Sequence, residues 1–226
     1  MSKSIIREVW EELRTVLGGR GGPIDSVLPP VVFVIALRFA TLLQAAVAAV
    51  GAAVLIGILR LTRGHRIVYA AAGMAGVAVA AGLSWGMGRA EAYFLPGIVS
   101  NAFTIVLCLV SVVVRRPMVA LTSHVARRWP LRWYWHPRVC PAYAEVTVAW
   151  ALFFGLRLGL QIALFRRGSA AALAAVGLIG GWPATVVLLV VSYLYGVRRL
   201  RILGGPSVEE FNAAAPPPWR GQRRGF

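Results

Sequence analysis

Residues 96–116, PGIVSNAFTIVLCLVSVVVRR, decide the fold of this chain. The run is apolar enough for hydrocarbon, and it is bounded by Pro96 at one end and by Arg115-Arg116-Pro117 at the other. A membrane-spanning helix needs roughly 20 such residues. We therefore predict that this stretch crosses a membrane as a helix and that the two arginines anchor it at one face.

The same pattern recurs along most of the 226 residues, of which 58% are hydrophobic and 14% charged. The mean hydropathy is +0.71, whereas a soluble domain usually carries about a quarter charged residues. We predict an all-α, polytopic integral membrane helical bundle. Its six hydrophobic segments are expected at about residues 27–42, 44–60, 67–87, 95–114, 142–165 and 170–197.

The charged residues define three regions around these segments. Residues 1–24 are expected to form an amphipathic arm on the cytoplasmic membrane surface, with apolar residues at helical spacing. Residues 25–197 form the transmembrane domain, and the inner loop 115–141 lies at the membrane interface. The basic, proline-rich tail, residues 198–226, is expected to be disordered in the cytoplasm.

Arginine placement predicts the orientation. With six segments and both termini in the cytoplasm, 19 basic residues lie inside and three outside, as the positive-inside rule requires. Residues 28–59 must supply two segments, which leaves each segment fewer than the roughly 20 residues that a spanning helix needs. We therefore expect the first segment to be short. It either spans as a short helix or is re-entrant or interfacial, in which case five helices span and the N-terminus moves outside.

The inner loop contains the stretch HVARRWPLRWYWHPR, residues 124–138, in which arginine alternates with aromatic residues. Such a stretch suits a membrane surface, with rings at headgroup level and guanidinium groups on anionic phosphates. A docking site for a cytoplasmic partner is the alternative. The predicted headgroup contacts are Arg115, Arg116, Arg127, Arg128, Trp129, Arg132, Trp133 and Trp135.

Glycines indicate where helices pack and bend. Gly82 and Gly86 have the GxxxG spacing that lets membrane helices approach closely. The run Gly180-Gly181-Trp182-Pro183 lies near the middle of the last segment, where proline removes a backbone hydrogen bond. We predict a kink there, and a substrate-site break of the transporter kind is the functional alternative.

Two segments carry polar seams of heptad period. The spacings of 4, 3, 4 and 3, or 3, 4, 3 and 4, place each set on one helix face. We expect both seams to face the bundle interior and helix neighbours. The first seam comprises Gly97, Asn101, Thr104, Cys108 and Ser111, and the second Thr147, Trp150, Phe154, Arg157 and Gln161.

Membrane depth predicts one contact between the seams. Asn101 and Gln161 lie at similar distances from the outer ends of their segments, so we expect Asn101 near Arg157 or Gln161. The candidate intramembrane polar cluster is Arg38, Gln44, Asn101, Arg157 and Gln161. Its arginines either snorkel outward or bind an anionic ligand such as a lipid phosphate from the outer leaflet.

No set of residues points to catalysis. The three histidines are separated from one another and from carboxylates, and Cys108 and Cys140 lie in different environments. Catalysis would require a base and a nucleophile within mutual reach. We therefore expect no enzyme activity, no catalytic residue, no cofactor and no metal. The basic charge is expected to meet anionic lipid rather than nucleic acid.

Three stretches together resemble a known family. They are VLPPVVFVIALRFA, PGIVSNAFTIVLCLVSVVVRRPMVAL and HPRVCPAYAEVTVAWALFFGLRLGLQIALF, starting at residues 27, 96 and 136. In order and spacing they resemble the intracellular septation protein A (YciB-like) family of inner-membrane proteins. The resemblance is closer to a related actinobacterial family of uncharacterised membrane proteins. It carries over no functional residue.

The resemblance implies a multi-pass protein of a bacterial cytoplasmic membrane with a role in septation or envelope maintenance. The leading functional hypothesis is a non-enzymatic membrane protein that supports envelope integrity through lipid contacts and through contacts with envelope or division proteins. The alternative is a transporter or lipid-handling protein that uses the arginine cluster. The oligomeric state is left open.

Overall fold

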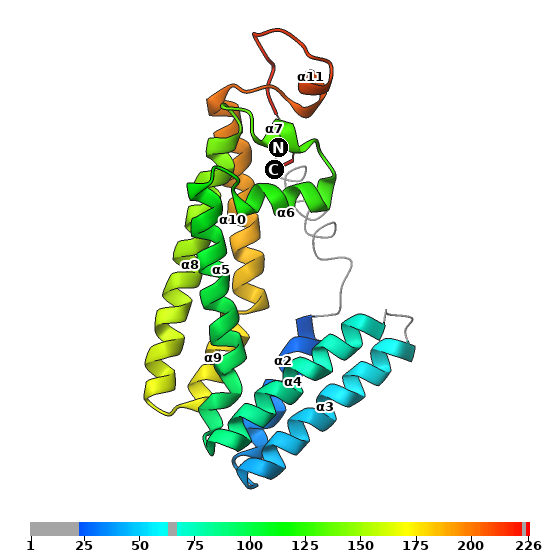
Figure 1. Cartoon of the computed structure of the whole chain (residues 1–226), viewed down its shortest axis with the longest axis vertical. Helices are drawn as coiled ribbons and strands as arrows, with labels where there is room; N and C mark the ends of the chain where they lie inside the picture. Colours follow the sequence, from blue (N-terminus) through cyan, green and yellow to red (C-terminus); the bar gives the residue numbers. More distant parts are fainter. Residues whose placement is uncertain (1–22, 63–66, 223–224) are drawn as a thin grey trace. The chain divides into compact units, whose positions relative to one another are not determined.

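A computed structural model describes residues 23–62, 67–222 and 225–226 (Figure 1). Within these ranges every regular element is helical, in agreement with the predicted all-α fold. Most of the arm that was predicted for residues 1–24, namely residues 1–22, lies outside the described residues. In chain order the elements are α2 (Pro23–Ala36), α3 (Leu42–Thr62), α4 (Ile67–Met87), η1 (Ala90–Phe94), α5 (Leu95–Val113), α6 (Met118–Arg127), α7 (Leu131–Tyr134), α8 (Cys140–Arg166), α9 (Ala170–Ile179), α10 (Trp182–Leu203) and α11 (Val208–Asn212).

Among the described residues, five stretches are long and apolar enough to cross a membrane, so the chain is a multi-pass membrane protein. The apolar part of α2 is only Val27–Ala36, which covers about 15 Å against a hydrocarbon core of roughly 30 Å. The first hydrophobic segment is therefore short, as predicted. The five long stretches are Leu42–Thr62, Ala70–Met87, Ala90–Val113, Cys140–Arg166 and Ala170–Leu203.

Large apolar side chains are exposed along all these stretches, among them Leu55, Leu156 and Val187. Exposed apolar surface on this scale is unfavourable in water and is satisfied by lipid. Because each stretch is helical over nearly all of its length, most of its backbone N–H and C=O groups are paired internally. Side-chain and backbone chemistry thus both agree with a hydrocarbon solvent.

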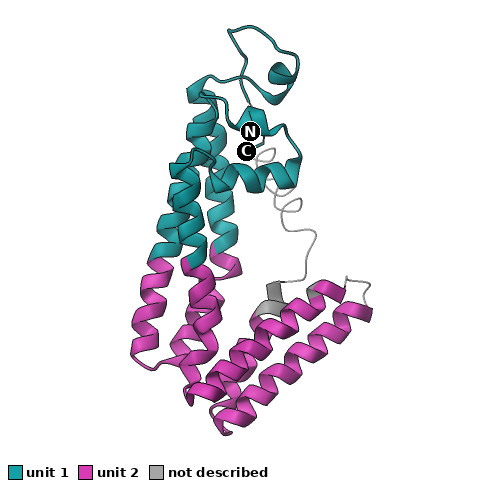
Figure 2. Ribbon diagram, in the orientation of Figure 1, with its two compact units in different colours: residues 1–19, 103–155, 185–226 teal, residues 20–102, 156–184 magenta. Residues whose placement is uncertain are grey.

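The chain divides into two compact units, each built from segments distant in sequence (Figure 2). In the described chain, unit 1 comprises Phe103–Gly155 and Thr185–Phe226, and unit 2 comprises residues 23–102 and Leu156–Ala184. Unit 2 therefore contains α2, α3, α4, η1 and α9. It also contains the first part of α5 and the last part of α8.

Small side chains form the packing surface of unit 2. Ala45, Ala46 and Ala49 of α3 are buried together with Ala80 and Ala81 of α4. Small residues permit the close backbone approach through which membrane helices gain van der Waals contact. At one edge of this cluster, the rings of Phe33 in α2 and Tyr93 in η1 stack with centroids 4.2 Å apart.

The predicted GxxxG contact in α4 is wrong. Gly82 and Gly86 are exposed, and a Cβ added to either glycine would meet no atom within 4 Å. Packing is closer at Gly57 of α3, where a Cβ would lie 2.8 Å from the Sδ atom of Met74 and the methionine side chain would have to shift. Elsewhere in the α3–α4 interface, the buried alanines of the two helices allow the close packing.

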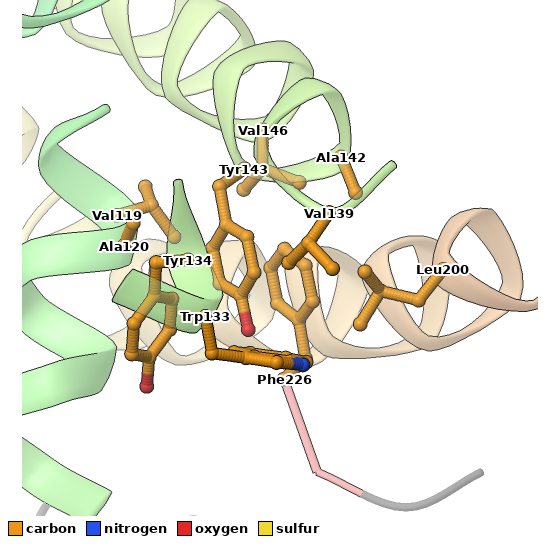
Figure 3. Packing of buried hydrophobic residues seen from close by; sticks show 10 residues of the cluster. All are labelled: Val119, Ala120, Trp133, Tyr134, Val139, Ala142, Tyr143, Val146, Leu200 and Phe226. Atoms are coloured by element: carbon orange, nitrogen blue, oxygen red, sulfur yellow. The ribbon is translucent and has the colours of Figure 1, made fainter. Parts of the chain in front are cut away.

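Aromatic side chains form the core of unit 1, and they come from three separate parts of the chain (Figure 3). Trp133 and Tyr134 of α7 and Tyr143 of α8 are fully buried. Their rings meet edge to face, with centroids 5.0 to 6.2 Å apart, as aromatic pairs prefer. Leu200 of α10 and Phe226 complete the cluster.

A sharp corner connects α5 to α6 in unit 1. The Ser111 hydroxyl donates to the Cys108 carbonyl at 2.7 Å and accepts from the Met118 N–H at 2.9 Å. Arg115 adopts a φ of 54° in this corner, and Pro117 precedes the first residue of α6. As a result, α6 runs across the axis of α5 rather than continuing it (Figure 1).

The structure contradicts the disordered tail predicted for residues 198–226. α10 continues to Leu203, and α11 begins with a capping box in which Ser207 and Glu210 bond each other's backbone N–H groups. The indole Nε1 of Trp133 donates to the Pro206 carbonyl at 2.9 Å. The Gly-Gly-Pro and Pro-Pro-Pro runs and the basic end of the tail predicted disorder, but Phe226 is buried in the core of unit 1.

Glu210 gives this tail a pH dependence. The N–H groups of Ser207, Arg220 and Gly221 donate to its carboxylate, and these bonds lower its pKa from 4.5 to about 2. A lowered folded-state pKa means that the stabilisation is complete above pH 4.5 and is lost as the pH falls through about 2. We expect the amide resonances of Arg220 and Gly221 to titrate in that window. Glu210→Gln should abolish this titration, whereas Glu209→Gln should preserve it.

Candidate functional site

Asn101 and Gln161 make a side-chain hydrogen bond within unit 2. The Asn101 Nδ2 donates to the Gln161 Oε1 at 3.0 Å, and both side chains are buried. The bond joins α5 to α8, so the predicted contact between the two seams is confirmed at this level. It follows from heptad spacing and matched depth, because an amide in hydrocarbon needs another polar group as its partner.

Arg157 lies one helical turn before Gln161 on α8 and is half-buried. Its Nε atom is buried and has no hydrogen-bond partner. Among the residues that the structure describes, no carboxylate forms an ion pair with Arg157. Glu91, an acidic residue of unit 2, is instead paired with Arg89, with its Oε2 3.5 Å from the Arg89 Nε. A positive charge inside a membrane segment is unfavourable without a counter-charge. Among the described residues, Arg157 therefore has no carboxylate as its counter-charge.

The last segment is interrupted at the place where the sequence predicted a kink. α9 ends at Ile179 and α10 begins at Trp182, which leaves Gly180 and Gly181 between them. The Arg157 side chain lies against this break: its Nε is 3.7 Å from where a Cβ on Gly180 would be. The last turn of α9 presents carbonyl oxygens, including that of Val176, near the same point. A cation is favoured at such a helix C-terminus.

Two members of the predicted polar cluster do not join it. Arg38 is exposed after the end of α2, and no contact among the described residues connects its side chain to Asn101, Arg157 or Gln161. Gln44 accepts from the Thr41 N–H at 2.9 Å, and Thr41 Oγ1 accepts from the Gln44 N–H at 3.4 Å. Gln44 thus caps the start of α3, a local role that follows from its distance of three residues from Thr41.

The two seams face inward over part of their length only. On α5, Asn101 and Cys108 are buried, Thr104 and Ser111 are half-buried, and Gly97 is exposed. The Cys108 thiol lies 3.8 Å from the Met118 sulfur. The exposed Gly97, near the start of α5, shows that the seam is not buried along its whole length.

On α8, the seam residues in unit 1 bond to elements other than α5. Thr147 is fully buried, and its hydroxyl accepts from the Val119 N–H of α6 at 3.3 Å. Trp150 donates from its indole N–H to Ser192 of α10 at 2.8 Å. Phe154 packs edge to face on Trp150, with centroids 6.3 Å apart. α8 therefore uses one face for three different neighbours along its length.

The predicted headgroup residues divide into exposed and buried sets. Trp133 is fully buried, so its prediction as a headgroup contact is wrong; apolar burial against Tyr134 and Tyr143 outweighs the interface for this ring. Trp129 and Trp135 are half-buried and lie under the guanidinium groups of Arg127, at 4.8 Å, and Arg116, at 4.5 Å. The exposed members are Arg115, Arg116, Arg128 and Arg132.

One ion pair in unit 1 was absent from the sequence predictions. The Arg199 guanidinium of α10 donates to both carboxylate oxygens of Glu145 on α8, at 2.7 and 2.8 Å. The Tyr195 hydroxyl, one turn earlier on α10, donates to the same carboxylate at 2.7 Å. The signal was present, because Glu145 is the only acid in its segment and Arg199 belongs to the basic run at the end of the last segment.

Within the described ranges, no three His, Cys, Asp or Glu side chains gather where they could hold a metal ion. The arrangement in unit 2 instead offers one guanidinium, two amides and the ends of two helices. Such groups can bind and orient an anion through charge and hydrogen bonds.

Comparison with known proteins places the chain in an uncharacterised group. The family that is described as "Protein of unknown function (DUF3159)" matches residues 17–201. No curated protein and no solved structure matches the chain. The expected relationship to septation protein A gains no specific support from these comparisons.

Proposed function

The chain belongs to this family of proteins of unknown function, and we propose from its own residues that it binds anionic lipid without catalysis. In this proposal it is an integral protein of a bacterial cytoplasmic membrane. It supports the integrity of the cell envelope through contacts with lipids and with envelope or division proteins.

The observation that carries the proposal is the uncompensated charge of Arg157. A guanidinium within a membrane segment normally finds a partner, and this one has an Nε that is buried without one. Arg157 lies nine residues before the end of α8 at Arg166, or roughly 13 Å along the helix. That depth is within reach of a headgroup when the side chain snorkels and the bilayer thins locally.

A lipid phosphate would supply the negative charge and the hydrogen-bond acceptors that the Arg157 guanidinium lacks. Guanidinium groups bind phosphate oxygens through two parallel charge-assisted hydrogen bonds. The acyl chains of the same lipid would cover exposed apolar side chains such as Leu156 and Leu160 on α8. Asn101 and Gln161 already satisfy each other, so they keep the α5–α8 contact rigid beside the arginine.

A second candidate function, transport of a small anion, is favoured by one observation. The last segment is interrupted at Gly180–Gly181, next to Arg157. Transporters use such interrupted helices to expose backbone groups to a substrate near the middle of the bilayer. We rank this function second because, within the part of the chain that the structure describes, we find no matching pair of interrupted helices in another half of the chain.

The test is a titration of the full-length protein, purified in detergent, with phosphatidylglycerol, followed by native mass spectrometry. Arg157→Gln should weaken one lipid-binding event by roughly 30-fold, since losing hydrogen bonds to a charged group costs about 2 kcal/mol. The matched control is Arg166→Gln, which removes an equal charge from the exposed end of the same helix and should leave that event unchanged.

Two further titrations separate the sources of the anion. Zwitterionic phosphatidylcholine should not compete with phosphatidylglycerol, and inorganic phosphate should bind more weakly because it lacks acyl chains. Equal lipid binding by the wild type and Arg157→Gln would contradict the proposal and return Arg157 to a structural role at the end of α9. Equally tight binding of inorganic phosphate would favour the transport function instead.

A further inference from the structure

The last two residues occupy a site on unit 1 formed by α6, α8 and α10. The Phe226 ring stacks on the ring of Tyr143, with centroids 4.2 Å apart and an angle of 5° between the planes. Figure 3 shows this ring among the aromatic side chains of α7 and α8. Phe226 is 9% exposed, so the site encloses the ring instead of only touching it.

Gly196 of α10 creates the space for this ring. A Cβ at position 196 would overlap the Phe226 ring atoms. The neighbouring Tyr193 and Val197 on the same helix pack against the cluster. The slot is flat: the Tyr143 ring bounds one side, and a single Cβ at position 196 would fill it from the other. Such a slot is specific for a planar group.

The site also binds the backbone of the dipeptide. The Arg127 Nε donates to the Phe226 carbonyl oxygen at 3.1 Å. The Gly225 N–H donates to the Tyr193 hydroxyl at 3.4 Å. Arg127 lies over the Trp129 ring at 4.8 Å, which fixes its guanidinium toward that carbonyl. One N–H and one carbonyl of the dipeptide are therefore bonded by side chains of the site.

Glycine is required immediately before the ring. Gly225 has a φ of 82°, a region that other residues rarely adopt. A Cβ on it would also lie 2.6 Å from the Trp129 ring. The site thus discriminates at two consecutive positions: it excludes a side chain at the first and takes an aromatic ring at the second.

The earlier part of the tail is held by separate contacts. Glu210 receives the N–H groups of Arg220 and Gly221, and Trp219 donates to the Ala215 carbonyl at 2.8 Å. These bonds lie within the tail itself, so Gly225–Phe226 is a distinct point of attachment. A tethered segment has an effective concentration in the millimolar range, which lets it occupy a site of modest intrinsic affinity.

We propose that this aromatic slot is a peptide-recognition site for a Gly-Phe segment, which the chain's own residues 225–226 occupy in cis. The proposal is independent of lipid binding at Arg157. It identifies the kind of partner that unit 1 can bind when its own tail withdraws: a peptide segment whose phenylalanine follows a glycine.

The experiment uses the full-length chain in detergent and a fluorescent, C-terminally amidated peptide WRGQRRGF, which repeats residues 219–226. The variant Phe226→Ala empties the slot and should bind this peptide saturably in fluorescence anisotropy. The wild type, whose tail competes, should bind it at least about tenfold more weakly. The control peptide WRGQRRGA has the same charge and should not bind measurably.

A double variant makes the result specific to the slot. Phe226→Ala combined with Gly196→Leu fills the space from the other side and should abolish peptide binding. Equal binding of the two peptides, or undiminished binding by the double variant, would show general attraction of a basic peptide and overturn the proposal. Absence of binding by a Phe226→Ala variant with native helix content would overturn it as well.

A second measurement covers the case in which Phe226→Ala does not fold. The wild-type chain with a fluorinated phenylalanine at position 226 reports directly on the ring environment by fluorine NMR. Excess WRGQRRGF should shift the signal from the stacked to the solvent-exposed position, and WRGQRRGA should not. An unchanged fluorine signal at millimolar peptide would contradict the proposal.

Discussion

Trp133→Ala should lower the free energy of unfolding by about 3–5 kcal/mol, the range for removing a large aromatic side chain from a core. Trp133 is fully buried and meets Trp129, Tyr134 and Tyr143 edge to face. Its loss leaves a cavity in unit 1 and an unpaired carbonyl at Pro206. Reversible unfolding of the full-length protein in mixed micelles, followed by circular dichroism, measures the change.

Trp135→Ala is the matched control for this prediction. Trp135 is half-buried and has the Arg116 guanidinium 4.5 Å from its ring centre, so its removal should cost only about 0.5–1 kcal/mol. Trp133→Phe should fall between the two, because it keeps most of the ring contacts and loses one hydrogen bond. Similar losses for Trp133→Ala and Trp135→Ala would mean that Trp133 is not the centre of this core.

Arg199→Gln should destabilise the protein, since it removes a two-pronged, charge-assisted contact with Glu145. The Arg199 and Glu145 side chains are 33% and 34% exposed, so the loss should be smaller than the roughly 3–5 kcal/mol seen for fully buried pairs. Glu145 would retain only the Tyr195 hydroxyl as a donor. The same unfolding measurement applies.

A double-mutant cycle with Glu145→Gln isolates this contact. The double variant should be less destabilised than the sum of the single variants, because each single change leaves one charge without its partner. Arg198→Gln is the control: it removes a charge from the exposed neighbouring residue and should change stability by less than about 0.5 kcal/mol. Strict additivity in the cycle would show that the 2.7 Å contact contributes nothing measurable.

Some contacts of the candidate site were predictable because they depend on local periodicity and depth. Asn101 and Gln161 occupy seam positions at matched heights, and a hydrogen bond between the two amides is favourable in hydrocarbon. The interruption at Gly180–Gly181 was predictable for a similarly local reason, since Pro183 cannot donate a helical hydrogen bond.

Other contacts were not predictable because they depend on which helix lies beside which. Arg38 and Gln44 have the same depth and polarity as the true neighbours, but the end of α2 directs Arg38 outward and Thr41 binds Gln44 locally. The partner of Glu145 is likewise a matter of helix rotation, because several arginines lie near the same ends of their segments.

The sequence by itself determined the solvent of this protein, the helical state of its apolar segments and the approximate ends of most of them. Hydropathy and the basic residues that bound each run are local quantities, and a helix satisfies its own backbone. Only the tertiary structure decided that Trp133 faces inward and that the tail returns to stack Phe226 on Tyr143. The stacking of Phe226 depends on a slot at Gly196, whose shape exists only after α6, α8 and α10 have come together.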